Sequence, residues 1–338
     1  GAGVTAAIQS SSAVTVMLVG LVNSGIMKLS QAIGVIMGSN IGTTITAWIL
    51  SLSGIESSNF FVRLLKPESF SPIMALVGII FIMASKSNRR KSVGAVLVGF
   101  AILMFGMEVM TDAMAPLADM PQFTHILTAF TNPILGVIVG TVVTAVIQSS
   151  AASIGILQAL SMVGGMTYAM AIPIIMGQNI GTCVSAMLSS IGVNTNAKRV
   201  AAVHVLFNVI GVIVCLSVFE FGYILFHFKF ATNNISPFGI AIVHSIFNIV
   251  TTILLFPFTK LLEKMAMRLV PDKKQSSKNV LLDERLLLAP TFAIAECYRQ
   301  TIKMAELVEY NFINSTKMLK SFHAKKADQI RENEIKID

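Results

Sequence analysis

Long apolar segments without charged residues dominate the chain up to about residue 258. Residues 1–27 and 134–197 contain no Asp, Glu, Lys or Arg. Apolar segments of about 18 or more residues are typical of membrane-spanning helices, whereas a large soluble protein would carry more charge on its surface. The pattern therefore predicts an all-α polytopic membrane protein. It places helices at 31–53, about 70–85, 92–114, 168–192, 200–226 and 237–258.

Two apolar segments are interrupted by polar residues before they are long enough to cross a membrane. From Pro133 to Ile147 the chain has 15 residues, which span ~22 Å as a helix and fall short of the ~30 Å hydrocarbon core. The polar run 148–150 (Gln-Ser-Ser) follows, and then a second apolar arm that ends near Val163. The same pattern surrounds Gln-Ser-Ser-Ser at 9–12. We expect each segment to be a re-entrant helical hairpin with the polar run at a broken tip; one long continuous helix is the alternative.

An internal repeat organises the chain. Residues 1–51 align with residues 140–190 at a constant offset and without gaps, and 24 of the 51 aligned positions are identical. Each copy contains a polar run and then a second shared block, MGSNIGT at 37–43 and MGQNIGT at 176–182. Paired repeats in an apolar chain indicate a transporter built from two homologous halves. An apolar segment precedes the second copy but not the first, so we expect a further helix N-terminal to the first copy.

Charge is scarce in this chain, and much of it is clustered. Charged residues make up 12% of the sequence, against ~25% in an average soluble domain, and the formal net charge is +8. If the basic cluster at 86–91 is cytoplasmic, re-entrant hairpins also place Lys198, Arg199 and the basic run 260–278 on that side, whereas continuous helices place them outside. The two hairpins then enter the membrane from opposite sides. The repeats are therefore expected to be inverted, with tips that can meet near the midplane, as alternating access requires.

A helix broken at Gln-Ser-Ser exposes groups that bind ions of both signs. Freed N–H groups at a helix N-terminus favour an anion, while carbonyl, hydroxyl and amide oxygens favour a hard cation such as sodium. The glycines of the second block allow another backbone to approach closely. Asn40 and Asn179 need polar partners in a membrane, and the hairpin tips are their natural candidates. Close helix packing by small residues, with an Asn–backbone hydrogen bond, is the alternative.

The other polar residues of the apolar region indicate neither a metal centre nor an enzyme. His204 with Asn208 and His244 with Asn248 lie four residues apart on one helix face and lack acidic or thiolate partners, so interhelical hydrogen bonding explains them better than metal ligation. Neither repeat block contains Asp or Glu, which favours sodium over protons. No Gly-rich phosphate loop or nucleophile motif occurs. The three cysteines are too widely spaced to suggest a disulfide framework.

The doubled Gln-Ser-Ser runs, each followed by Gly-x-Asn-Ile-Gly-Thr, resemble the type II sodium–phosphate cotransporter family in its bacterial form over residues 1–258. The resemblance implies that phosphate and sodium, the one metal ion expected, bind at the hairpin tips. The second motif departs from the family pattern at its third serine, which is Ala151 here, and Ser153 is a candidate replacement. The binding residues so implied are Gln9, Ser10, Ser11, Ser12, Asn40, Thr43, Gln148, Ser149, Ser150, Asn179 and Thr182, to which we add Thr44, Ser153, Asn208 and Asn248.

Bacterial members of this family often carry a cytoplasmic PhoU-like helical domain, and residues 281–338 resemble the start of one. An ordinary amphipathic helix or a linker is the alternative. A complete helical bundle would need more chain, so we expect further sequence beyond this C-terminus. The predicted domains are membrane repeat 1 at 1–92, membrane repeat 2 with an extra helix at 93–258, a basic linker at 259–280 and the PhoU-like start at 281–338.

Together with the sequence pattern, the resemblance implies a multi-pass protein of the bacterial inner membrane, with a cytoplasmic C-terminus, that moves inorganic phosphate together with sodium as a secondary active symporter. We expect no enzyme activity, no cofactor besides the co-transported sodium, and no nucleic-acid partner; a homo-oligomer stays open. One alternative is a phosphate exporter or a carrier of a related oxyanion. Another is a membrane phosphate sensor that acts through the tail. Sodium dependence, flux direction and binding without flux distinguish these hypotheses.

Overall fold

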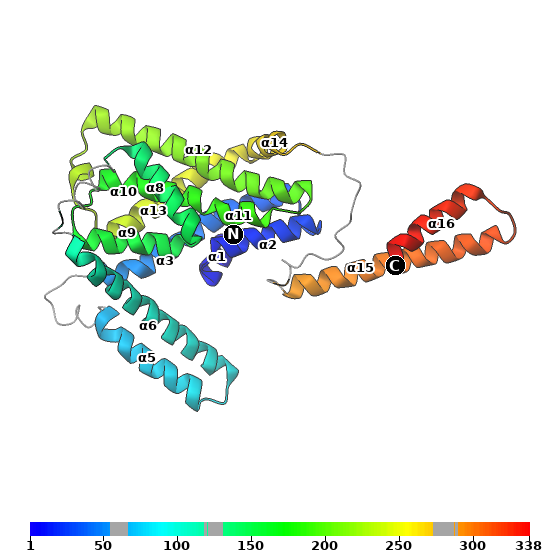
Figure 1. The fold of residues 1–338 in the computed structure, drawn as a ribbon, viewed down its shortest axis with the longest axis horizontal. Coiled ribbons are helices and arrows are strands. Elements are labelled where there is room, and N and C mark those ends of the chain that lie inside the picture. The colour runs from blue at the N-terminus through cyan, green and yellow to red at the C-terminus, as the bar shows by residue number, and fades with distance from the viewer. Residues whose placement is uncertain (55–66, 118–119, 121–130, 273–286, 288–289) are drawn as a thin grey trace.

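The computed structural model describes residues 1–54, 67–117, 120, 131–272, 287 and 290–338. These residues are mainly helical, and the one strand-like contact among them is an isolated antiparallel bridge between Thr167 and Asn234. Figure 1 shows a bundle of helices from which two helix pairs project, α5 with α6 and α15 with α16. The elements are α1 (Ala2–Ile8), α2 (Ser11–Asn23), α3 (Leu29–Ser51), η1 (Leu52–Gly54), α5 (Pro67–Ala84), α6 (Asn88–Met114), η2 (Ala115–Leu117), α8 (Pro133–Ile147), α9 (Ser150–Val163), α10 (Tyr168–Gly181), α11 (Cys183–Ser189), α12 (Thr195–Phe226), η3 (Lys229–Thr232), α13 (Pro237–Leu255), η4 (Phe256–Phe258), α14 (Thr259–Leu269), α15 (Pro290–Met318) and α16 (Ala324–Ile337).

The prediction of an all-α, multi-pass membrane protein is confirmed. Two of the expected helices differ in detail from the sequence pattern. The stretch 168–192 is interrupted at Thr182, which separates α10 from α11, and the helix expected to end at 258 passes through η4 into α14. Pro257 explains the irregular turn, because proline supplies no backbone N–H to a continuous helix. Within the described residues, five helical stretches are long and apolar enough to cross a membrane: Leu29–Gly54, Asn88–Ala113, Tyr168–Ser189, Thr195–Phe226 and Pro237–Leu269.

Both polar runs break the helix at the same place. Gln9 has φ 59° and ψ 27°, and Gln148 has φ 57° and ψ 20°, so each lies in the left-handed region that L-residues seldom adopt. The next residue, Ser10 or Ser149, is the N-cap of the second arm, and its hydroxyl accepts from the backbone N–H three residues on. The predicted break is therefore confirmed. That each pair of arms is a re-entrant hairpin, and the side of the membrane from which it enters, stay predictions; the name hairpin is kept below for each pair of arms.

Each hairpin packs on both repeats. In the following, the block helix is the one that carries Gly-x-Asn-Ile-Gly-Thr, which is α3 in the first repeat and α10 with α11 in the second. The first arm of each hairpin packs on the block helix of its own repeat, α1 on α3 and α8 on α10. The second arm also packs on the block helix of the other repeat, α2 on α11 and α9 on α3. The two halves are thus interlocked through their hairpins.

The two long helices that follow the second repeat complete the same arrangement. α12 covers α2 and α11, while α13 covers α9 and α3. One buried apolar cluster joins Leu18 of α2, Ile36 of α3 and Phe207 of α12. A second joins Ile154 of α9 and Ile240 of α13 to Ala47, near the C-terminal end of α3, and to α10. The bundle core therefore lies where each hairpin arm meets a block helix and a covering helix.

Glycines in the block helices let the first arms approach closely. A Cβ added at Gly42 would lie 2.6 Å from Ala2 O in α1, and one added at Gly181 would lie 2.5 Å from Thr141 O in α8. Both distances are shorter than side-chain atoms tolerate, so only glycine fits without moving a helix. The repeated glycines thus let a neighbouring backbone approach closely, as predicted from the sequence.

The stretch predicted as a basic linker begins with a helix. α14 packs on α12 and α3, with Leu262 and Ala266 buried against them, and residues 273–280 lie outside the described residues. The tail beyond it contains α15 and α16, which pack on each other. Parts of the PhoU-like stretch, 281–286 and 288–289, lie outside the described residues as well. The likeness of this tail to PhoU stays a prediction.

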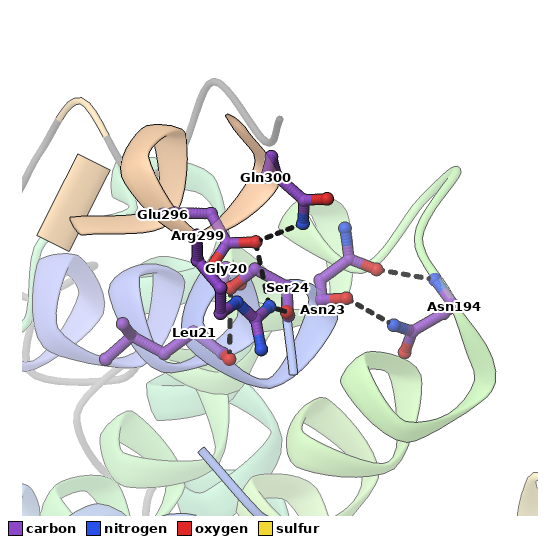
Figure 2. Close-up of polar contacts among 8 residues, drawn as sticks. All are labelled: Gly20, Leu21, Asn23, Ser24, Asn194, Glu296, Arg299 and Gln300. Atoms are coloured by element: carbon purple, nitrogen blue, oxygen red, sulfur yellow. Dashed lines mark hydrogen bonds and ion pairs between the residues drawn. The ribbon is translucent and has the colours of Figure 1, made fainter. Parts of the chain in front are cut away.

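The tail contacts the membrane bundle at the C-terminal end of α2. Figure 2 shows Arg299 of α15 donating to the carbonyl of Ser24, while its guanidinium also bonds the buried carboxylate of Glu296 2.8 Å away. Beside this contact, Asn194 before α12 donates to Asn23 O at 2.7 Å. A cation near a helix C-terminus is stabilised by the negative end of the helix dipole. The second arm of the first hairpin is therefore fixed to both α12 and the tail.

Candidate functional site

The first hairpin tip is bonded to its block helix through the glutamine. Thr46 Oγ1 in α3 donates to Gln9 Oε1 at 2.7 Å, and Gln9 Nε2 donates to Ala6 O. Gln9 is exposed, Ser10 and Ser12 are half-buried, and Ser11 is buried. The sequence pattern did not single out Thr46. The signal that marks it is a hydroxyl residue at the same place in both repeats, because the equivalent position is Ser185.

The second tip is held by different bonds. Thr144 Oγ1 in α8 donates to Ser153 Oγ in α9 at 2.7 Å, which joins the two arms of the hairpin. Gln178 Nε2 of α10 donates to Ser153 O at 3.0 Å. Gln148 is exposed and Ser149 and Ser150 are half-buried, as expected for a tip that a ligand can reach. Ser153, proposed as a replacement for the missing third serine, is instead buried and bonded within the hairpin.

Among the described residues, the two block asparagines form no hydrogen bond with the hairpin tips, so the predicted pairing between them is wrong. Asn179 Nδ2 donates to Ile175 O of its own helix at 2.9 Å, which is the Asn–backbone bond considered as the alternative. Asn40 Nδ2 is buried and has no hydrogen-bond partner among the described residues. Both side chains are almost fully buried. The Asn179 amide is thus used within its own helix, whereas the Asn40 amide is left without a partner among the described residues.

The block threonines also bond their own helices. Thr43 Oγ1 donates to Ser39 O at 3.0 Å, Thr44 Oγ1 to Ile41 O at 2.8 Å, and Thr182 Oγ1 to Asn179 O at 2.6 Å. A hydroxyl that donates to its own helix still has lone pairs free to accept a hydrogen bond or bind a cation. These threonines are therefore available as oxygen ligands, not as donors to an anion.

The His–Asn pairs occupy equivalent places on α12 and α13. Asn208 Nδ2 donates to His204 O at 3.0 Å and contacts Cys183 Sγ of α11 at 3.3 Å, which is an interhelical contact. Asn248 Nδ2 donates to His244 O at 2.8 Å within its own helix. The Oδ1 atoms of both asparagines are buried without a partner among the described residues. Each covering helix thus offers one unpaired amide oxygen to the interior of the bundle.

Gln158 links the two repeats at a position the sequence pattern did not mark. Its Nε2 donates to Ala47 O in α3 and to Pro237 O at the start of α13, each at 3.0 Å. The side chain is fully buried in α9. The equivalent residue of the first repeat is Val19, so no internal signal pointed to it.

The chemistry of the site follows from helix ends rather than from charges. The first repeat block contains one charged residue, Lys28, and the second contains none. The N-terminal ends of α2 and α9 present backbone N–H groups and serine hydroxyls, which suit an oxyanion. Carbonyls at the ends of α1 and α8, together with amide and hydroxyl oxygens, suit a sodium ion. Among the described residues, no group of three or more His, Cys, Asp or Glu side chains comes together as a metal site would need.

Comparison with known proteins identifies the family. The model of the Na+/Pi-cotransporter family matches residues 1–112 and 102–236, one match for each repeat. The chain belongs to this family. It is also similar to the putative inorganic phosphate export protein YjbB of Salmonella typhimurium, with 26% identity over 91% of this chain and 55% of that protein. It therefore spans about half the length of that relative.

Two further relatives widen the comparison. An uncharacterized protein of Bacillus subtilis, YqeW, is 27% identical over 80% of this chain and 82% of its own length. The human sodium-dependent phosphate transport protein 2B is 31% identical over 180 residues, which are 48% of this chain and 23% of that protein. No solved structure matches the chain.

Proposed function

We propose that this chain moves inorganic phosphate across a membrane, coupled to sodium, through a site at the two hairpin tips. The observation that carries the proposal is the pair of identical breaks, each with a left-handed glutamine and a serine N-cap at the head of a new helix. Two helix N-termini supply donors for an oxyanion without a lysine or arginine. Family membership and the name of the human relative support phosphate and sodium as the ligands.

The interlocked packing supports alternating access as the mechanism. Because each second arm packs on the block helix of the other repeat, movement of one repeat against the other changes the surroundings of both tips at once. We take the repeats to be inverted and the hairpins to be re-entrant, since that topology places the basic clusters of the chain on one side. Bound sodium then completes the oxyanion site, because its charge offsets that of phosphate.

Export is the second candidate, and a specific observation favours it. A relative whose match covers 91% of this chain is named as a putative phosphate export protein. The same site can serve either direction, because flux through an alternating-access carrier follows the ion gradients. On either reading the chain is placed in the bacterial inner membrane, with α14 and the tail on the cytoplasmic side. A sensor role through a PhoU-like tail is retained as the outcome in which phosphate binds without flux.

Radiolabelled phosphate flux in proteoliposomes tests the proposal. The purified chain is reconstituted, and uptake is measured with an inward sodium gradient and with potassium in place of sodium. Efflux from phosphate-loaded vesicles is measured under the reverse gradient. Sodium-driven flux is expected in at least one direction. Equal flux in sodium and potassium would exclude coupling, and phosphate binding without flux in either direction would exclude transport.

Paired substitutions at the break separate side chain from backbone. Gln148→Gly keeps the left-handed turn, because glycine adopts it freely, whereas Gln148→Ala removes the same amide and keeps the strain. If the amide binds a ligand, both variants lose sodium-driven flux by at least tenfold. Flux retained in the glycine variant alone would show that only the backbone break matters at this residue. Gln9→Gly and Gln9→Ala test the first tip in the same way.

A further inference from the structure

The length of α13 places α14 at the membrane surface. α13 has 19 residues, or about 28 Å of helix, which nearly equals the ~30 Å hydrocarbon core. The 3-10 turn η4 follows without a break, and then the 11 residues of α14. Because α13 already crosses the core, α14 begins in the headgroup region on the side where α13 ends.

α14 carries a basic stripe on one exposed face. Lys260, Lys264 and Arg268 are spaced by four residues, so they cover about 80° of the helix circumference. All three side chains are exposed. The single acidic residue of this helix, Glu263, is half-buried and faces a cavity of about 350 Å³ that Lys28 and Arg199 also line. The stripe is therefore not neutralised from within its own helix.

Apolar residues lie opposite the stripe and beside it. On the opposite face, Leu262 and Ala266 pack on α12 and α3 and fix the rotation of the helix. Leu261, which borders the stripe, is 52% exposed, and Leu269 in the last turn is 63% exposed. The turn before α14 adds two exposed aromatic side chains, Phe256 and Phe258. A helix with a basic face, an exposed apolar edge and a position at the end of a membrane span has the composition of an interfacial anchor.

The charges on the elements packed against α14 do not cancel the stripe. Arg199 at the start of α12 is buried and donates to Asp272 at 2.9 Å, so this pair is neutral. Lys28 before α3 adds one more positive charge beside Glu263. The exposed surface around α14 is therefore net positive within the described residues.

We propose that α14 lies in the headgroup layer and binds anionic phospholipid, with its basic stripe on the phosphate groups and its apolar edge among the acyl chains. The surface of an anionic leaflet is the partner that matches both charge and apolar edge, since a soluble anion would use only the charge. The inference rests on the membrane topology of α13 and not on which solute the chain carries.

Native mass spectrometry of the purified full-length chain tests the proposal. The protein is delipidated in a neutral detergent and titrated with phosphatidylglycerol or with phosphatidylcholine of the same acyl chains. Wild type is expected to bind phosphatidylglycerol more tightly. K260Q/K264Q/R268Q is expected to lose about fivefold in phosphatidylglycerol affinity for each charge removed, and to keep its phosphatidylcholine affinity.

A matched control uses three exposed lysines on the tail. K320Q/K325Q/K326Q removes the same number of charges far from α14, and its lipid binding should equal that of wild type. An equal loss in the control, or an unchanged preference in the α14 variant, would overturn the proposal. Raising the salt concentration tests the wild type without a substitution: phosphatidylglycerol binding should weaken and phosphatidylcholine binding should not. A salt-independent preference would exclude the basic stripe as its cause.

Discussion

Gly177→Ala tests whether close packing of α8 on α10 holds the second hairpin in place. A Cβ at Gly177 would lie 2.1 Å from Val137 O and 2.8 Å from Val137 Cα. Carbon atoms in contact with neighbours sit at about 3.5 Å, so the helices must separate by about 1 Å. The obstructing atoms belong to the backbone of α8, which cannot turn aside as a flexible side chain can.

The expected cost combines three terms. Overpacking of this kind costs about 1–3 kcal/mol. Separation also stretches the bond from Thr141 Oγ1 to Gly177 O, now 3.0 Å, whose loss costs about 1 kcal/mol. Alanine restores about 1 kcal/mol through its higher helix propensity. The net loss of unfolding free energy is about 2 kcal/mol, which corresponds to a fall of roughly 4–8 °C in Tm.

Thermal unfolding in detergent, followed by circular dichroism, measures the effect. The matched control is Gly34→Ala in α3, where nothing lies within 4 Å of the added Cβ, so this variant should be as stable as wild type or slightly more stable. Gly38→Ala, which would meet Ala2 N at 2.9 Å and so overlaps less than Gly177→Ala, should fall between the two. Equal Tm values for Gly177→Ala and Gly34→Ala would refute the reasoning.

Three other substitutions probe single hydrogen bonds. Thr46→Val removes the donor to Gln9 Oε1 and should lower sodium-driven phosphate flux with a stability loss of about 1 kcal/mol; unchanged flux would mean that this bond does not position the tip. Gln158→Met removes two bonds of about 1 kcal/mol each and one unpaired buried oxygen, so Tm should fall by roughly 2–4 °C, and a rise would contradict the inter-repeat link. Ser153→Ala leaves Thr144 Oγ1 unpaired and should destabilise the second hairpin by about 1–3 kcal/mol, measured by chemical denaturation, with Ser12→Ala as the control that leaves Tm unchanged.

The helix breaks at Gln9 and Gln148 could be predicted because their cause is local. An arm of 15 residues is too short to cross the membrane, and Gln-Ser-Ser interrupts its apolar run in both copies. The serine caps at Ser10 and Ser149 are the residue type that helix starts prefer. What surrounds each tip could not be predicted from the same pattern. The donor to Gln9 is Thr46, 37 residues away, and its distance in sequence carries no periodic signal.

Longer-range packing decided the features that the sequence pattern missed. The packing of each second arm on the other repeat depends on the contacts of α2 with α11 and of α9 with α3. The sequence does not reveal these contacts, because amphipathic patterns are weak in helices that are apolar on all faces. The pairing expected for Asn40 and Asn179 failed for the same reason, because polarity alone does not say which helix supplies the partner. The sequence pattern predicted a linker where α14 lies. Its basic residues look like a polar stretch until they and the apolar residues between them are placed on a helix.

The two repeats break their helices at equivalent positions, but their buried polar groups form different hydrogen bonds. In the second hairpin, Thr144 donates to Ser153. In the first, the equivalent Thr5 faces the arm that has Val14 in that place, and its buried hydroxyl has no partner among the described residues. An unpaired buried donor costs about 1–3 kcal/mol, and a ligand that accepts from it offsets that cost. Within the two aligned repeats, the buried donors left unpaired, Thr5 Oγ1 and Asn40 Nδ2, therefore lie in the first repeat, whereas the unpaired groups of the second, Gln158 Oε1 and Gln178 Oε1, are acceptors.

Asn40→Ala and Asn179→Ala should for this reason have different effects. Asn40 Nδ2 has no partner among the described residues, so its loss should cost little stability but should weaken phosphate binding, raising the KM for flux by about tenfold if one hydrogen bond to the anion is lost. Asn179 Nδ2 bonds Ile175 O, so its loss should lower Tm and leave KM nearly unchanged. Phosphate dependence of flux and thermal unfolding, measured on both variants, separate the two effects. Equal KM values would mean that the unpaired amide of Asn40 faces packing alone, and the anion would then have to be bound by the helix ends without it.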